Sequence, residues 1–175
     1  MNSLERLRRE ARFVHRALLR GDERTRRRID EQTPKRKHVL RALAQELGFA
    51  GWGHASAALS GRSTDFGAFF YPPSGGAYWN VWCARYDEAA SIRAEANAFL
   101  FPYRHQYFIA EAGYLDHLGV PADDPRWRWA GRDWLAPKDR EAQQDLLDAL
   151  VFARLRRRPP HGVQMPRDGC ADICL

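Results

Sequence analysis

One short segment concentrates polar and aromatic side chains that could do chemistry, Tyr103-Arg104-His105-Gln106-Tyr107. In a β-strand, alternate side chains point to one face, which would place Tyr103, His105 and Tyr107 together. A histidine can transfer a proton and an arginine can hold an anionic group, so a small enzyme is one interpretation. An aromatic sheet with one hydrogen-bonded histidine is the other. The candidate ligand-pocket residues are Asn80, Trp82, Tyr103, Arg104, His105 and Tyr107. No nucleophile, base and orienting acid can be assembled from the sequence, so we predict no catalytic residue.

The end of the chain carries a second set of reactive side chains. Two of the three cysteines fall in the last six residues. The candidates for metal binding or modification are His161, Met165, Cys170 and Cys174. Such soft or borderline ligands could bind copper(I) or zinc. The two thiols could also form a reversible disulfide, serve as the substrate of a modifying enzyme, or be incidental.

Positive charge is concentrated in the first third of the chain. Residues 1–62 hold 15 Lys and Arg against 7 Asp and Glu, whereas the remainder holds 13 against 15. An acidic protein or a nucleic acid is the kind of partner that such asymmetry favours. The candidate contacts are Arg24, Arg26, Arg27, Arg28, Lys35, Arg36 and Lys37. A solvated helix with internal ion pairs is the alternative, because glutamates interrupt the arginines. No recognisable nucleic-acid-binding motif accompanies the charge.

Several function classes lack their signatures. Ser74-Gly75-Gly76 is not followed by the lysine of a nucleotide-binding loop, and no paired cysteine motif indicates zinc. No stretch approaches the ~20 apolar residues that span a bilayer, so we expect no membrane partner. Three cysteines make no disulfide framework, which favours a cytoplasmic location.

Helices are predicted around these segments. Leu7, Ala11, Val14 and Leu18 recur at three- and four-residue steps, which predicts an amphipathic helix over residues 3–20. Thr33-Pro34 has the residues of a helix start, and Gly48 can end that helix in the left-handed conformation. A second short helix should then cover residues 55–59.

Beyond residue 61 the pattern changes to mixed strands and helices. Two aromatic strands, 66–71 and 77–83, should form a hairpin, and residues 100–109 should form a third strand. The predicted helices cover residues 87–99, 110–118 and 138–156, with a single turn after Asp124-Pro125. The expected fold class is α+β, with a basic helical region (1–61), an α+β body (62–158) and a flexible tail (159–175).

The stretch from His38 to Trp52, HVLRALAQELGFAGW, carries a resemblance to a known element. Residues 33–60 resemble the short N-terminal helical element of bacterial ankyrin-repeat and glyoxalase-related proteins; the remainder resembles uncharacterised bacterial proteins. The resemblance implies a helix, a Gly-Phe turn, a tryptophan and a second helix, with no catalytic residue. Gly51 and Gly53 stand where the common form has serine and proline.

These observations favour a non-enzymatic binding or adaptor protein. Its basic helical region would engage an acidic partner, and its aromatic body would provide a second recognition surface. The alternatives are a protein that works through its C-terminal cysteines and a small enzyme with a pocket around His105.

Overall fold

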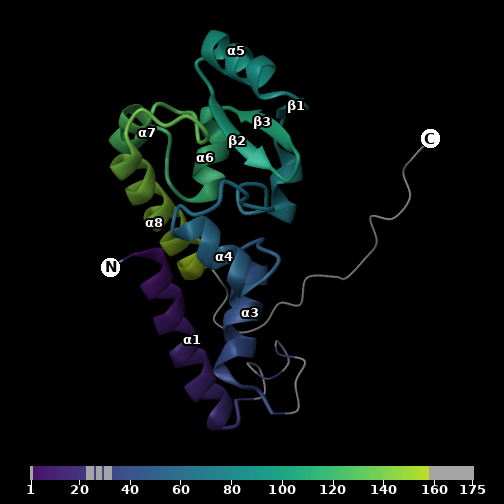
Figure 1. Ribbon diagram of the computed structural model, residues 1–175, viewed down its shortest axis with the longest axis vertical. Coiled ribbons are helices and arrows are strands. Elements are labelled where there is room, and N and C mark those ends of the chain that lie inside the picture. Colours follow the sequence, from purple (N-terminus) through teal and green to yellow (C-terminus); the bar gives the residue numbers. More distant parts are fainter. Residues whose placement is uncertain (1, 23–25, 27–28, 30–32, 158–175) are drawn as a thin grey trace, which may run out of the picture.

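The computed structural model describes residues 2–22, 26, 29 and 33–157. Within them, seven α-helices accompany a three-stranded antiparallel sheet, which confirms the predicted α+β class. The elements are α1 (Ser3–Leu19), α3 (Arg36–Glu46), α4 (Trp52–Leu59), the 3₁₀ helix η1 (Pro73–Ala77), β1 (Val81–Cys83), α5 (Tyr86–Ala96), β2 (Phe99–Tyr103), β3 (Gln106–Ala110), α6 (Ala112–Leu118), α7 (Pro125–Ala130) and α8 (Arg140–Arg157). The sheet and α5 lie at one end of the molecule, and α1 and α3 lie side by side at the other (Figure 1).

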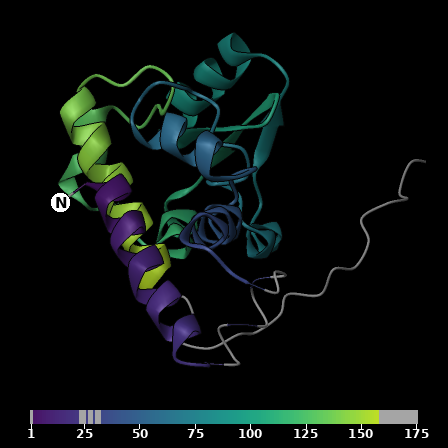
Figure 2. The same ribbon diagram turned by 60° about the horizontal axis from the view of Figure 1, so that its bottom comes forward.

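Helix α1 forms as its apolar spacing predicts. The Asn2 side chain accepts a hydrogen bond from the Glu5 N–H, and the Glu5 carboxylate accepts one from the Asn2 N–H, so a capping box begins the helix. Leu7, Ala11 and Val14 are buried against the rest of the protein. Helix α1 contacts both α3 and α8 (Figure 2), so its apolar stripe faces inward and its opposite face remains in solvent.

Helices α3 and α4 differ from their predicted starts. Helix α3 begins at Arg36, two residues after Pro34, because Lys35 is still extended (φ −93°, ψ 160°) and serves as the N-cap residue. The Pro34 carbonyl oxygen contacts the His15 ring instead (Nε2 to O, 3.1 Å). Gly48 follows α3 with φ +94°, the predicted left-handed conformation. Helix α4 starts at Trp52 rather than residue 55.

The chain crosses itself closely at two glycines. The Ala68 N–H donates to the Gly48 carbonyl oxygen at 2.9 Å. A Cβ added to Gly48 would lie 2.7 Å from the Ala68 carbonyl carbon, and one added to Gly67 would lie 2.8 Å from the Gly48 oxygen. Both positions therefore need glycine, since each also has a positive φ.

The predicted hairpin of strands 66–71 and 77–83 is wrong. Phe66, Phe69 and Phe70 are all buried, so their side chains do not alternate between two faces. Turn hydrogen bonds join the Phe69 N–H to the Phe66 oxygen and the Tyr71 N–H to the Ala68 oxygen. Only residues 81–83 of the second segment form a strand, β1, and it pairs with β3.

The predicted single strand 100–109 is a hairpin instead. Strands β2 and β3 pair antiparallel, with Tyr103 opposite Gln106 and Arg104-His105 in the turn between them. Arg104 adopts φ +52°, which lets the chain reverse there.

The sheet has the order β1-β3-β2 and separates two apolar clusters. Because directly paired residues share a face, Trp82, Phe101 and Phe108 lie on one side. The latter two belong to the main cluster, which extends from Leu7 in α1 to Val151 in α8. Residues on the other face, including Cys83, Leu100 and Ile109, pack with α5 in a smaller cluster.

Candidate functional site

The six predicted ligand-pocket residues do not converge on one face of the sheet. Trp82 and Tyr103 share the inner face, with ring centroids 5.5 Å apart. Tyr107 lies on the opposite face and contacts Tyr86, with ring centroids 5.9 Å apart. His105 lies in the exposed hairpin turn. The prediction that Tyr103, His105 and Tyr107 share a face is therefore wrong, because the turn interrupts the strand between them.

Aromatic rings fill the inner face next to Trp82. Tyr71 packs on Trp82, Tyr103 and Phe108, with ring centroids 5.0, 5.5 and 5.4 Å away. Arg104 extends this group, since its guanidinium carbon lies 5.3 Å from the centre of the Tyr103 ring. These contacts describe a packed aromatic layer at the sheet.

The chain entering β1 presents apolar side chains to solvent. Trp79 is 99% exposed, and Val81 and Trp82 are also exposed. Asn80 precedes the strand, and its amide nitrogen donates to the Tyr78 carbonyl oxygen at 3.2 Å. Strand β1 is an edge strand, so this aromatic edge, defined here as Tyr78, Trp79, Val81 and Trp82, could contact another molecule.

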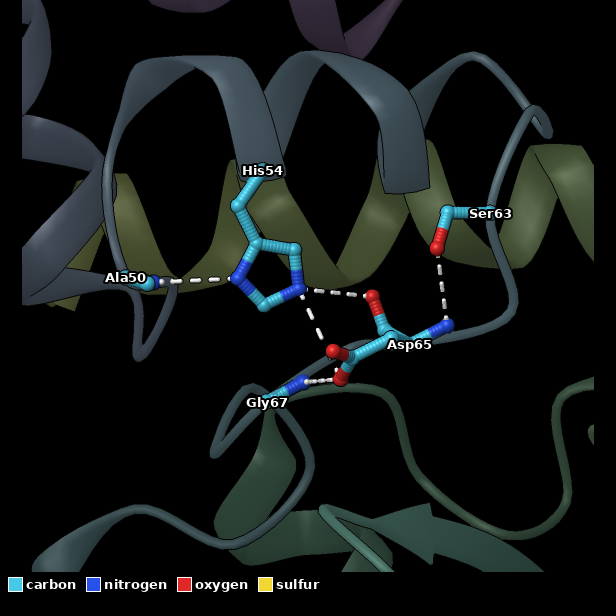
Figure 3. A network of polar contacts seen from close by, with 5 residues as sticks. All are labelled: Ala50, His54, Ser63, Asp65 and Gly67. Carbon is cyan, nitrogen blue, oxygen red and sulfur yellow. Dashed lines mark hydrogen bonds and ion pairs between the residues drawn. The ribbon is translucent and has the colours of Figure 1, made fainter.

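A histidine that the sequence did not single out, His54, belongs to a network of polar contacts after α4 (Figure 3). His54 Nδ1 accepts from the Ala50 N–H at 3.1 Å, and Nε2 donates to the Asp65 carbonyl oxygen at 2.8 Å. The Asp65 carboxylate accepts from the Gly67 N–H at 2.8 Å, and Ser63 Oγ accepts from the Asp65 N–H at 3.1 Å. Histidine, aspartate and serine are the residue types of a hydrolase triad, but here the serine oxygen contacts a backbone N–H rather than the imidazole. The network holds the loop after α4 against the start of that helix.

Asp133 is buried, and its carboxylate is hydrogen-bonded within the protein. Its carboxylate accepts from the Tyr86 hydroxyl at 2.9 Å and from the N–H groups of Leu135 and Ala136 at 3.0 and 3.1 Å. Burial, followed by this hydrogen bond, raises the pKa of Tyr86. Because the donors lie two and three residues later in the chain, the Asp133 carboxylate caps the start of a tight turn.

The most distinctive charged surface lies on α1. Arg8, Arg9, Arg12, Arg16 and Arg20 recur at steps of three and four residues, and all five are exposed. We call this set the α1 arginine face. Across the described residues, the side chains of Arg9, Arg12, Arg16 and Arg20 make no ion pair or hydrogen bond. Arg8 lies over the Trp52 ring, 5.8 Å from its centre. The partner contacts predicted from the sequence lie later in the chain, although the spacing of these arginines is visible in the sequence.

The predicted basic residues fall partly within the structure. Lys35, Arg36 and Lys37 are exposed at the start of α3, which packs beside α1, and Arg26 is exposed. Arg24, Arg27 and Arg28 lie outside the described residues. Positive charge on α1 is thus continued on the neighbouring helix.

Two arginines of α8 are arranged differently. Arg154 Nη1 donates to the Leu47 carbonyl oxygen at 3.0 Å. Arg157 donates to the carbonyl oxygens of His117 and Asp116 at 2.7 and 2.9 Å. Both close the C-terminal ends of other helices, α3 and α6. Burial lowers the pKa of Arg154 to about 10, so the side chain stays charged at neutral pH. We call this set the α8 arginine pair.

The predicted tail ligands His161, Met165, Cys170 and Cys174 lie outside the described residues. Among residues that are described, no three histidine, cysteine or acidic side chains are grouped to hold a metal ion. Cys83 is a free, buried thiol, and burial raises its pKa.

None of the helices in the described ranges is both long and apolar enough to cross a membrane. Comparison of the chain with models of protein families, with curated proteins and with solved structures found no match. The resemblance of residues 33–60 to a helical element of other proteins therefore stays a prediction.

Proposed function

We propose that this chain is a non-enzymatic binding or adaptor protein that engages an acidic partner through its basic helical region. The observation that carries the proposal is the α1 arginine face, where five exposed arginines share one side of a helix. From Arg8 to Arg20 the face extends about 18 Å at 1.5 Å per residue. An array of this length suits an extended polyanion better than a small anion.

Within the part of the chain that the structure describes, Arg9, Arg12, Arg16 and Arg20 make no ion pair, which supports this use of the face. A helix whose arginines only keep the protein hydrated would commonly alternate them with carboxylates at three- and four-residue steps. On the exposed side of α1, Glu5 is the one exposed carboxylate beside the five arginines. Lys35, Arg36 and Lys37 extend the charge onto α3.

The aromatic edge supplies a second recognition surface for the adaptor. Exposed tryptophan side chains are favoured at the centres of interfaces, and an unpaired strand edge can accept an extended peptide. The edge belongs to the sheet, whereas the α1 arginine face lies at the other end of the molecule (Figure 1). Two partners could therefore be held at the same time.

The test is the salt dependence of binding to duplex DNA and to polyglutamate. Affinity for DNA should fall between 50 and 200 mM salt, with a slope of about 0.9 per phosphate contact in a double-logarithmic plot. The Arg9/Arg12/Arg16→Gln variant should lower that slope by about 2 to 3. The matched control, Arg85/Arg128/Arg140→Gln, removes the same charge from exposed positions elsewhere and should leave the slope unchanged. Failure to bind duplex DNA, single-stranded DNA and polyglutamate alike at 50 mM salt would refute the proposal.

A further inference from the structure

One exposed aromatic side chain lies within the α1 arginine face. Phe13 is 71% exposed and belongs to neither apolar cluster of the described residues. Arg9 precedes it by four residues and Arg16 follows it by three, and helix neighbours at these spacings have Cβ atoms about 5–6 Å apart. The Phe13 side chain therefore starts next to those of Arg9 and Arg16 on the solvent side of the helix, with the half-buried Glu10 as a third neighbour.

The combination of a free ring and flanking arginines distinguishes among acidic partners. An acidic peptide offers carboxylates to the arginines, but carboxylates have no favourable interaction with the phenyl ring of Phe13. Duplex DNA offers phosphates, but its base faces are covered by stacking. Single-stranded nucleic acid offers both phosphates and free base faces, and proteins bind it with basic surfaces and aromatic stacking platforms.

We propose that the α1 arginine face binds single-stranded nucleic acid, with an unpaired base stacked on Phe13 and adjacent phosphates paired with the flanking arginines. This inference rests on the proposed function, because it names the partner of the same surface. Charge supplies most of the affinity without sequence preference, and the ring supplies the preference for unpaired bases. The planar guanidinium of Arg12 or Arg16 can also stack on a neighbouring base.

The experiment measures binding of the full chain to a fluorescent dT12 oligonucleotide by anisotropy at two salt concentrations. Phe13→Ala should weaken binding about 5- to 150-fold, the loss expected for one stacked base, with an unchanged salt slope. Its matched control is Trp129→Ala, which removes a ring that is 52% exposed on α7 and should not change the affinity. Because Phe13 is exposed, circular dichroism should show that the variant keeps its helices.

An abasic twelve-residue oligonucleotide completes the test. Wild-type protein should bind it as weakly as Phe13→Ala binds dT12, and the variant should lose nothing further, because the stacking partner is already missing. Equal affinity of wild type and Phe13→Ala for dT12, or equal affinity of wild type for dT12, duplex DNA and polyglutamate, would overturn the inference and leave the proposed function standing. Absence of binding to all of these polyanions would instead overturn the proposed function.

Discussion

Arginine has two different uses in two regions of this molecule. The α8 arginine pair donates hydrogen bonds to carbonyl oxygens at the ends of α3 and α6. Four of the five side chains of the α1 arginine face make no ion pair or hydrogen bond within the described residues. Charge alone does not separate the two sets, but their hydrogen-bond partners do. The arginines that bond the carbonyl oxygens at helix ends stabilise the fold. Those without hydrogen-bond partners in the described residues are available to bind another molecule.

Replacing Arg154 should show the largest effect on stability. Arg154→Ala removes the hydrogen bond to the Leu47 carbonyl oxygen and uncovers Phe69, whose ring centre lies 4.7 Å from the guanidinium carbon. We expect the free energy of unfolding to fall by about 1.5–3 kcal/mol, the range for a hydrogen bond from a charged donor. Urea unfolding measures it.

Arg154→Met is the control, because it keeps most of the side-chain volume and removes only the charge and the donor. It should lose less stability than Arg154→Ala. If Arg154→Ala were as stable as wild type, the cost of desolvating the Arg154 charge would cancel the gain from its hydrogen bond. The α8 arginine pair would then contribute no more to stability than the α1 arginine face.

Arg157→Ala should have a smaller effect of the same kind. Its two hydrogen bonds reach the last turn of α6, but the side chain is exposed and competes with water. We expect a loss of about 0.5–1 kcal/mol, typical of a cation at a helix C-terminus. Thermal unfolding at low and high salt measures it, and Arg156→Ala, an exposed neighbour, is the control.

The free energy of unfolding should change with pH in the mildly acidic range because of His117. Burial, followed by the charges of Arg154 and Arg157, lowers the pKa of His117 below its ordinary value of 6.5. The unfolded chain therefore binds this proton at a higher pH than the folded protein, and the stabilisation present above about pH 6.5 is lost as pH falls toward the lowered pKa. The pH dependence of urea unfolding should flatten in this window in His117→Gln. An unchanged profile would contradict the predicted contribution.

The α1 arginine face should show the smallest effect on stability. Arg9→Gln and Arg16→Gln remove no hydrogen bond, so the free energy of unfolding should stay within about 0.5 kcal/mol of wild type. Relief of repulsion between like charges would make any change at low salt slightly stabilising. Differential scanning calorimetry measures this, and a loss above 1 kcal/mol would show that these arginines are structural.

Much of the helical structure is predictable from local signals. The apolar spacing of α1, the left-handed Gly48 and Gly119, and Asp124 at the start of α7 all act within a few residues. The sheet is less predictable, because aromatic residues are equally suited to strands and to buried turns. Nothing in the sequence marks Arg104 as the residue of positive φ in the hairpin turn.

The arginine surfaces also differ in how far the sequence predicts them. The α1 arginine face follows from helical spacing alone, and its members can be read from the sequence once the helix is assigned. The role of Arg154 cannot be read in this way, because its partner Leu47 lies 107 residues away in the chain. The prediction that Tyr103, His105 and Tyr107 share one face is wrong because residues 104–105 form a turn. The alternating pattern of residues 100–109 gives no sign of that turn.

The close crossing of Gly48 and Gly67 has a consequence for how the sequence can vary. The nearest atom to a methyl group at either position would be a backbone atom, and at Gly67 the His54 ring would also lie 3.1 Å away. In a library that substitutes every position, both should reject all replacements, and no second-site change at the other should rescue them. The crossing therefore fixes both ends of the segment that contains α4. Because Ala55, Ala58 and Leu59 of that helix are buried, insertions should be tolerated only in the exposed loop at residues 60–62.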